Sequence, residues 1–434
     1  MNADSTSTAP PAATTPETND GVRVATSERL VSLDQFRGYT VAGMIVVNFV
    51  GGLAAIHPVL KHHDIYFSYA DSIMPSFLFV CGFAYRLTML RRISRVGSGP
   101  ACRHVIVRSL GLVMVSLVMY GFNKEFKTWD KLRAFGAWEF CATLLKSDLW
   151  ETLAIIGASQ VLALPFIALR ARWRVLATAG LMVGHLLLSG WFNWNFVHGR
   201  PNLLDAYWGA AGKTAWDGGF FGVMMWSALL LFGSLAFDIM KATRAWVAAT
   251  SLIALGLVLG ASGYALSCLS TLYDPEPAAS APAAADAKDV KAEPAPLSPV
   301  WPPLERLKTK PWRHWLAEPP LVPPPKNRAE SYWMMNKRIV SIPFVLFAAG
   351  VAYVLNGLFV LACDVGPLQI GLFRTFGRNA LAAYFLHHFV EEAMLSVVPG
   401  DSPLAWCLFG IGVYFAVTYI MLRSLEKQGV FLRL

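Results

Sequence analysis

The sequence is poor in charged residues. Asp, Glu, Lys and Arg make up 15% of the 434 residues, and hydrophobic residues make up 55%. Ordinary soluble domains carry about 25% charged residues, so this balance predicts a polytopic membrane protein. The formal net charge of +9 then reflects membrane topology and contact with anionic headgroups of the lipid bilayer, and no nucleic-acid partner is expected.

The sequence also lacks the motifs of several enzyme classes. Its six cysteines are scattered without a CxxC pair, and we expect them to be small buried side chains. There is no glycine-rich nucleotide loop, no HExxH, no GxSxG and no repeat of solenoid length. We therefore expect no disulfide framework and no metal.

Long apolar stretches recur along the chain, each long enough to cross a hydrocarbon core of ~30 Å. They predict an all-α fold, a polytopic transmembrane helix bundle of about ten spans with a Pro/Ala-rich extramembrane insert. The predicted spans are 38–56, 70–90, 104–122, 149–169, 174–192, 218–240, 245–268, 339–363, 376–397 and 403–422.

Composition divides the chain into four segments. Residues 1–28, rich in Thr, Ala and Pro, predict a disordered N-terminal tail. Residues 29–272 would form spans one to seven and the catalytic core, and 337–434 the last three spans. Between them, 273–336 is rich in Pro and Ala, which predicts an extended outer linker that acts as a tether.

Lys and Arg gather in alternate loops. These loops are 91–103, 170–174 and 241–244, after the second, fourth and sixth predicted spans. The positive-inside rule places these loops and both termini in the cytoplasm. The loop 57–71 and the linker would then face outward. Residues 123–148 are basic but would lie outside, and we interpret them as an amphipathic helix in the interface.

The loop between the first two predicted spans is rich in histidine. His57, His62 and His63 lie there beside Asp64 and Asp71. Three interpretations are open: solvated interfacial histidines, metal ligands, or acid–base and nucleophilic catalysis. In the catalytic interpretation, a carboxylate such as that of Asp71 would fix the tautomer of the imidazole and stabilise its charged form.

Two predicted spans carry polar residues that are costly in hydrocarbon. In the first span, Arg37, Val41, Met44 and Asn48 share one helical face. In the ninth span, polar side chains fall within an arc of about 140°, which indicates a lined cavity more than contact with lipid. These are Tyr384, His387, His388, Glu391 and Glu392.

Two runs of the sequence, RLVSLDQFRGYTVAGMIVVNFVGG and KHH…YADSIMPSFLFVCG, contain the polar residues of the first span and the loop histidines. These runs resemble the start of the catalytic domain of a known family, heparan-alpha-glucosaminide N-acetyltransferase and its bacterial relatives. The matching positions are Arg29, Ser32, Asp34, Phe36, Arg37, Gly38, Asn48, a loop histidine, Asp71, Pro75, Phe77 and Phe79. Weaker matches follow at 202–205, at 377–381 with Tyr384 and His387, and at 423–434.

The resemblance implies a multi-pass acetyltransferase of the bacterial inner membrane. It would take the acetyl group from cytosolic acetyl-CoA, as a co-substrate, and deliver it to an amino-sugar or glycan acceptor on the outer side. The proposed catalytic histidine falls on His62 or His63, and it acts through an acetyl-imidazole or as a general base. A homodimer is a further expectation for the assembly of the protein.

The remaining site residues follow from this mechanism. With the histidine, Asp71 and Asn48 complete the catalytic group, Asn48 as a donor to the developing oxyanion. Cofactor-binding residues at the basic face would be Arg37, Arg374, Arg378 and Asn379, because guanidinium groups bind phosphate oxygens. Tyr384 and His387 would contact the acceptor.

The chain departs from the family pattern at two places. Residues 157–161 lack the family's arginine, and 217–219 lack its glutamate. Two expectations follow from these departures: a divergent acceptor, or loss of the activity. The alternatives from other classes are a sugar or amino-sugar transporter without acyl transfer, and a membrane scaffold built around the Pro-rich insert.

Overall fold

The computed structural model describes residues 30–121, 127–208, 212–275 and 297–432. Over these residues the chain is helical and contains no β-strand, which confirms the all-α prediction. The predicted N-terminal tail, 1–28, and residues 276–296 of the predicted linker lie outside the described residues.

The long helices form the bundle. They are α1 (Val31–Val50), α2 (Tyr69–Val96), α3 (Ser98–Ser116), α6 (Thr152–Ile167), α7 (Ala171–Leu188), α10 (Gly219–Ala242), α11 (Ala245–Ser267), α13 (Ile342–Val360), α15 (Ala380–Leu395) and α16 (Leu404–Lys427). Shorter helices connect them: α4 (Trp129–Phe135), α5 (Ala137–Thr143), α8 (Trp194–Val197), α9 (Leu203–Trp208), α12 (Arg306–Thr309) and α14 (Gly371–Arg378). Single π-helical turns extend α3, α5, α7 and α13.

Each predicted span coincides with a helix, but the count of ten is not confirmed. Among the described residues, seven helices are long and apolar enough to cross a membrane, or eight if the bent pair Ala137–Asp148 and Thr152–Ile167 is one span. Two of the long helices lie outside this count of eight. They are α1, which carries Asp34, Gln35 and Arg37 in its first two turns, and α15, which has 16 residues. At 1.5 Å per residue, α15 reaches about 24 Å, short of a typical core of ~30 Å.

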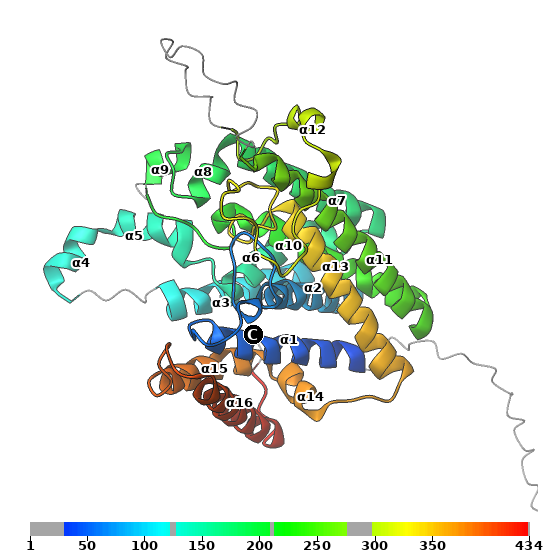
Figure 1. Cartoon of the computed structure of the whole chain (residues 1–434). Helices are drawn as coiled ribbons and strands as arrows, with labels where there is room; N and C mark the ends of the chain where they lie inside the picture. The colour runs from blue at the N-terminus through cyan, green and yellow to red at the C-terminus, as the bar shows by residue number, and fades with distance from the viewer. Residues whose placement is uncertain (1–29, 122–126, 209–211, 276–296, 433–434) are drawn as a thin grey trace, which may run out of the picture.

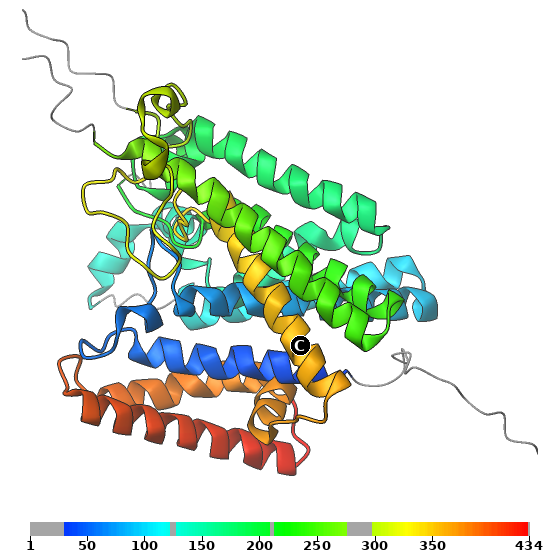
Figure 2. The same cartoon turned by 45° about the vertical axis from the view of Figure 1, so that its right-hand side comes forward.

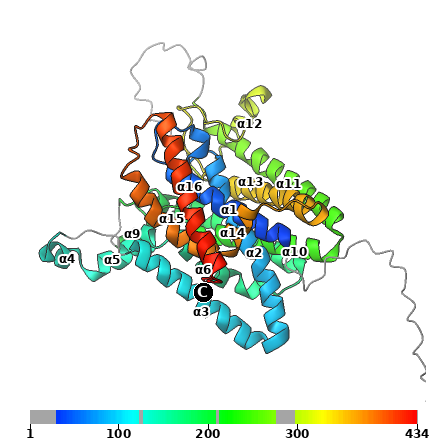
Figure 3. The ribbon, with the colours of Figure 1, turned by 90° about the horizontal axis from the view of Figure 1, so that it is seen from below.

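Helix α1 lies inside the bundle. In Figures 1 and 2 it runs between α2 on one side and α14, α15 and α16 on the other, and its contacts agree. On the far side of α2, α10 packs against α2, α6 and α7, and α11 pairs with α13. Figure 3, seen from below, has α16 and α15 nearest the viewer and α1 behind them.

Small residues allow α2 and α10 to pack with their backbones in contact. A Cβ atom at Gly82 would overlap the carbonyl oxygen of Leu230, and one at Gly233 would overlap that of Phe79. Close packing of this kind is a main source of helix association where no hydrophobic effect acts between helices in lipid. The α2–α10 pair therefore fixes the position of α2, which forms one wall of the cavity described below.

The described half of the insert is not an extended tether, and that expectation is wrong for residues 297–336. Tyr332 is fully buried with its hydroxyl 3.1 Å from His185 Nδ1, and Trp333 Nε1 donates to the Val300 carbonyl at 2.8 Å. Arg328 is held by Asp274 at 2.6 Å. The prediction rested on the Pro and Ala content and did not weigh these aromatic and paired charged side chains. They give the segment enough buried contact to pack on the bundle.

Replacing Gly82 by Ala tests the α2–α10 contact. The added methyl must displace backbone, so we expect the free energy of unfolding to fall by about 1–3 kcal/mol, seen as a lower melting temperature in detergent. Gly99→Ala is the control, because a Cβ there meets nothing within 4 Å. Equal melting temperatures for the two variants would show that the helices are not in backbone contact.

Candidate active site

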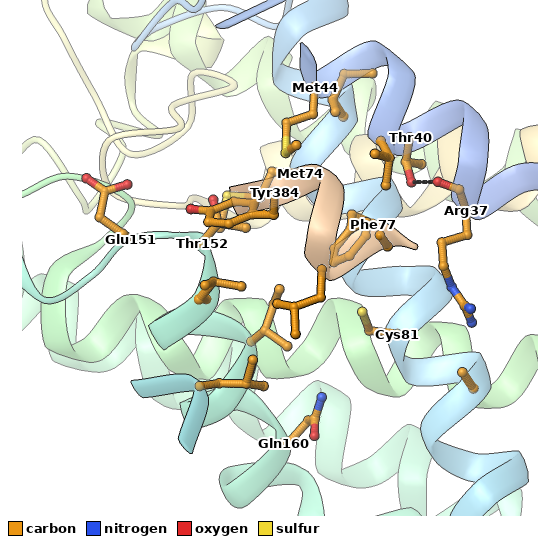
Figure 4. Close-up of a pocket in the computed structure, with 18 of the residues that line it drawn as sticks. Arg37, Thr40, Met44, Met74, Phe77, Cys81, Glu151, Thr152, Gln160 and Tyr384 are labelled. Atoms are coloured by element: carbon orange, nitrogen blue, oxygen red, sulfur yellow. Dashed lines mark hydrogen bonds between the residues drawn. The ribbon is translucent and has the colours of Figure 1, made fainter. Parts of the chain in front are cut away.

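The described part of the bundle contains a large cavity. Its volume is about 920 Å³, at the upper end of the range of roughly 300–1,000 Å³ for small-molecule sites. Figure 4 shows its walls, with Phe77 and Cys81 near the middle, Arg37 on one side and Glu151 on the other.

The cavity follows one face of α2 for most of its length. The lining positions recur every three or four residues, as one helical face requires. They are Ala70, Ile73, Met74, Phe77, Cys81, Ala84, Tyr85, Thr88 and Arg92. From residue 70 to residue 92 the helix rises about 33 Å, comparable to a bilayer core of ~30 Å. The cavity is therefore about as long as a bilayer core is thick.

The two ends of the cavity differ in chemistry. One end, here called the arginine end, is lined by Arg37, Arg92, His104, Arg108 and Arg378. The other, the histidine end, is lined by Asn48, His62, Tyr120, Glu151, Trp216, Asp217, Lys337, Tyr384 and His388. Between them the wall is mostly apolar, so charge is concentrated where the cavity begins and ends.

His62 and Asp71 form the central pair of the histidine end. His62 Nδ1 lies 2.9 Å from Asp71 Oδ1, and the Asp71 side chain is fully buried. Because a carboxylate only accepts hydrogen bonds, Nδ1 carries the proton and Nε2 is left with its lone pair. Ser68 and Asp71 also form the capping box that begins α2, so the helix start holds the carboxylate in place.

The imidazole ring of His63 is held away from the cavity. Its Nε2 lies 2.8 Å from the Pro58 carbonyl oxygen, and its ring stacks on Tyr66 with centroids 4.1 Å apart. It is not among the residues that line the cavity. Only its backbone N–H reaches the site, where it donates to Asp71 Oδ2 at 3.2 Å.

Asn48 lines the cavity and is oriented by His387. His387 Nδ1 donates to the Ala383 carbonyl at 3.1 Å, so its Nε2 accepts from Asn48 Nδ2 at 3.3 Å. His387 is fully buried behind Asn48 and does not line the cavity. The amide of Asn48 keeps a second N–H for a ligand.

Tyr384 reaches the cavity wall from α15. Its hydroxyl lies 3.0 Å from the Tyr120 hydroxyl, which in turn bonds His388 Nε2. The metal-ligating atoms of His387, His388 and Glu391 lie within 4.8 Å of one another. Both Nε2 atoms of the histidines already have hydrogen-bond partners in Asn48 and Tyr120, so the arrangement serves as a polar network in this structure.

The structure places two of the four predicted cofactor-binding residues at the cavity. Arg37 and Arg378 line the arginine end, where Arg37 lies 3.8 Å from Asp34 and Arg378 donates to Glu426 at 2.9 Å. Arg374 does not line the cavity and is half exposed, and Asn379 is buried away from it.

Several cavity residues were not predicted as site residues. Arg108 lies inside a predicted span, and a cation within an apolar run is itself a signal of a lined interior that sequence reasoning missed. Arg92 was interpreted only as a topology signal. Glu151 and Lys337 carried no local pattern, and Asp217 was noted only as part of the altered family element at 217–219, because only the fold brings these residues to the histidine end.

The motif at 202–205 lies beside the cavity. Asp205 accepts from Lys146 Nζ at 2.5 Å and from Asn202 Nδ2 at 2.6 Å, and both Lys146 and Asp205 are buried. This pair ties α9 to the π-helical turn Leu144–Asp148, just ahead of Glu151. Its contribution is to hold that part of the histidine end in position.

The fold and cavity together define a helical membrane protein with an internal site whose two ends differ in charge. Residues 29–262 match a family model described as heparan-alpha-glucosaminide N-acetyltransferase, catalytic. This match covers more than half of the chain, and the protein belongs to this family. The family implies acetyltransferase activity and gives no support to a transporter. No curated protein matches the chain.

Thiol labelling tests whether the cavity is open at its middle. Cys81 lines the cavity. Cys407, in the first turn of α16, is fully buried, and its Sγ lies 3.3 Å from the Ser402 carbonyl oxygen. In single-cysteine variants, a small maleimide should label Cys81 in the folded protein and should label Cys407 only after unfolding, as measured by mass spectrometry. A Cys81 that labels no faster than Cys407 even at alkaline pH, where thiols ionise, would contradict an open cavity.

Proposed function

We propose that this protein transfers an acetyl group from acetyl-CoA, bound at the arginine end, to the amine of an amino sugar or related glycan, bound at the histidine end. The observation that carries this proposal is the single cavity along α2, with cations at one end and an imidazole at the other. Such a cavity suits two substrates that approach from opposite sides of a membrane.

The arginine end fits the phosphates of the donor. Guanidinium groups form bidentate, charge-assisted hydrogen bonds with phosphate oxygens. Arg37, Arg92 and Arg108 come from three different helices and converge on the same end of the cavity. The pantetheine arm would lie along the apolar middle and carry the thioester toward Asn48. The distribution of Lys and Arg in the loops supports a cytoplasmic arginine end.

The histidine end fits base catalysis of amide formation. Nε2 of His62 accepts a proton from the acceptor amine while the amine nitrogen attacks the thioester carbonyl carbon. A C–N bond forms, the C–S bond breaks, and the leaving CoA thiolate takes the proton from Nε2. Asp71 stabilises the transient imidazolium, and the free N–H of Asn48 is placed to donate to the oxyanion.

The acidic side chains at the histidine end favour a cationic acceptor. Glu151 and Asp217 line the cavity there, and an amino sugar carries an ammonium group before it loses its proton. Trp216 lies at the same end with an exposed ring, which offers an apolar face for a sugar. The family name and this charge pattern therefore agree on an amino-sugar acceptor.

Single replacements of the two neighbouring histidines should differ. His62→Ala should lower kcat for acetyl transfer by about 10²–10⁴-fold, because the base is lost. Acetyl-CoA binding, measured by calorimetry, should stay near normal, since the phosphates are held at the other end. His63→Ala is the matched control and should change kcat little. A large loss in the control with full activity in His62→Ala would refute this assignment.

Replacing an arginine should separate donor binding from chemistry. Arg108→Gln removes one charge-assisted hydrogen bond, so the Kd for acetyl-CoA should rise by about tenfold or more, with a small effect on kcat at saturating donor. Arg103→Gln is the control, because Arg103 is exposed on the same helix and does not line the cavity. Equal donor affinity for both variants would mean that the donor binds elsewhere.

A further inference from the structure

Lys337 reaches the histidine end from a distant part of the chain. It follows the insert, 275 residues after His62, and lies outside the family match at 29–262. It lines the same cavity as His62.

The ammonium group of Lys337 lies among the acidic side chains of the site. Its Nζ is 3.4 Å from His62 Nδ1, 3.7 Å from Asp71 Oδ1 and 3.8 Å from Asp217 Oδ1. The side chain is 15% exposed, so these charges interact with little screening by water. Burial works against the charged amine, yet Asp217, Asp71 and Asp64 together hold the pKa of Lys337 above its usual range. Lys337 is therefore a cation at neutral pH.

The backbone fixes Lys337 in this position. Its N–H donates to the Asp64 carbonyl at 2.8 Å, and the carbonyl of the next residue, Arg338, accepts from Gly218 at 2.8 Å. The Arg338 side chain also donates to the Asp64 carboxylate at 2.6 Å. The segment thus joins the histidine loop to the turn before α10.

Strained backbone flanks the same segment. Three non-glycine residues in the described part of the chain have positive φ, and two of them are Asp217, at 48°, and Val340, at 55°. Such a conformation is costly, above all for a β-branched residue, and it persists where the surrounding structure requires it. The fold therefore accepts strain at two places near Lys337: at Val340, three residues after it, and at Asp217, whose carboxylate lies 3.8 Å from its Nζ.

We propose that Lys337 is a positioning residue for acetyl transfer, which keeps Asp71 as the charged acceptor of the His62 Nδ1 proton and leaves Nε2 free to act as the base. The inference rests on the proposed function.

The charges around His62 show why a cation is needed. Asp71 from α2, Asp217 from the turn before α10 and Asp64 from the histidine loop are all close to it, and Asp64 is paired with Arg338. Without Lys337, the carboxylates of Asp71 and Asp217 would face one imidazole unopposed. Two buried carboxylates that repel each other favour the neutral acid form of one of them, and a protonated Asp71 would no longer be the charged acceptor of the Nδ1 proton.

The test uses the full-length protein and five variants. Lys337→Gln should lower kcat by about 10- to 100-fold, with the Kd for acetyl-CoA unchanged. Lys337→Arg should recover most of the rate, because the charge is retained. Lys326→Gln is the control, since Lys326 is an exposed lysine of the preceding insert. In an Asp71→Asn background, Lys337→Gln should cost much less, because the carboxylate through which it acts has lost its charge.

The outcomes separate this inference from the proposed function. Wild-type turnover in a folded Lys337→Gln protein would overturn the role of Lys337 alone, as would an equal loss in Lys337→Arg or full additivity with Asp71→Asn. A wild-type protein that binds no acetyl-CoA and transfers no acetyl group would overturn both. Unchanged donor affinity in Lys337→Gln serves as the check that the variant is folded.

Discussion

The carboxylate of Asp71 holds the histidine end together. It accepts hydrogen bonds from His62 Nδ1, from the His63 backbone N–H and from Ser68, through both its backbone and its hydroxyl. These donors account for the acceptor capacity of a carboxylate. The group begins α2, orients the imidazole and attracts Lys337, so one side chain joins the start of a helix to the chemistry of the cavity.

Helix α2 carries this local arrangement across the bundle. Its first turn holds Asp71 and its last turns hold Arg92, and the cavity follows the face between them. The backbone contact with α10 at Gly82 and Gly233 fixes the opposite face. A rigid α2 thus keeps the His62 imidazole at one end and the arginines at the other at a separation set by the helical rise, which is what the proposed transfer between two sides of a membrane requires.

Sequence patterns with short spacing predicted much of the fold and part of the site. Apolar runs located the helices, and the spacing within 29–92 brought Asn48, His62 and Asp71 to notice, all of which the structure places together. The choice between His62 and His63 depended on ring direction, which sequence does not encode. Lys337 and Asp217 meet His62 only through the tertiary fold, and the composition of the insert hid its packed half. The count of ten spans is not confirmed, because the first two turns of α1 are polar and α15 is short.

The central claim is that one cavity lets donor and acceptor meet from opposite sides of the membrane. It is tested most directly in vesicles that contain the purified protein in one orientation, with acetyl-CoA supplied on one side only and an amino sugar enclosed on the other. The account predicts that acetylated sugar forms only when acetyl-CoA is on the side of the arginine end. Product that forms only when both substrates share one side would contradict it.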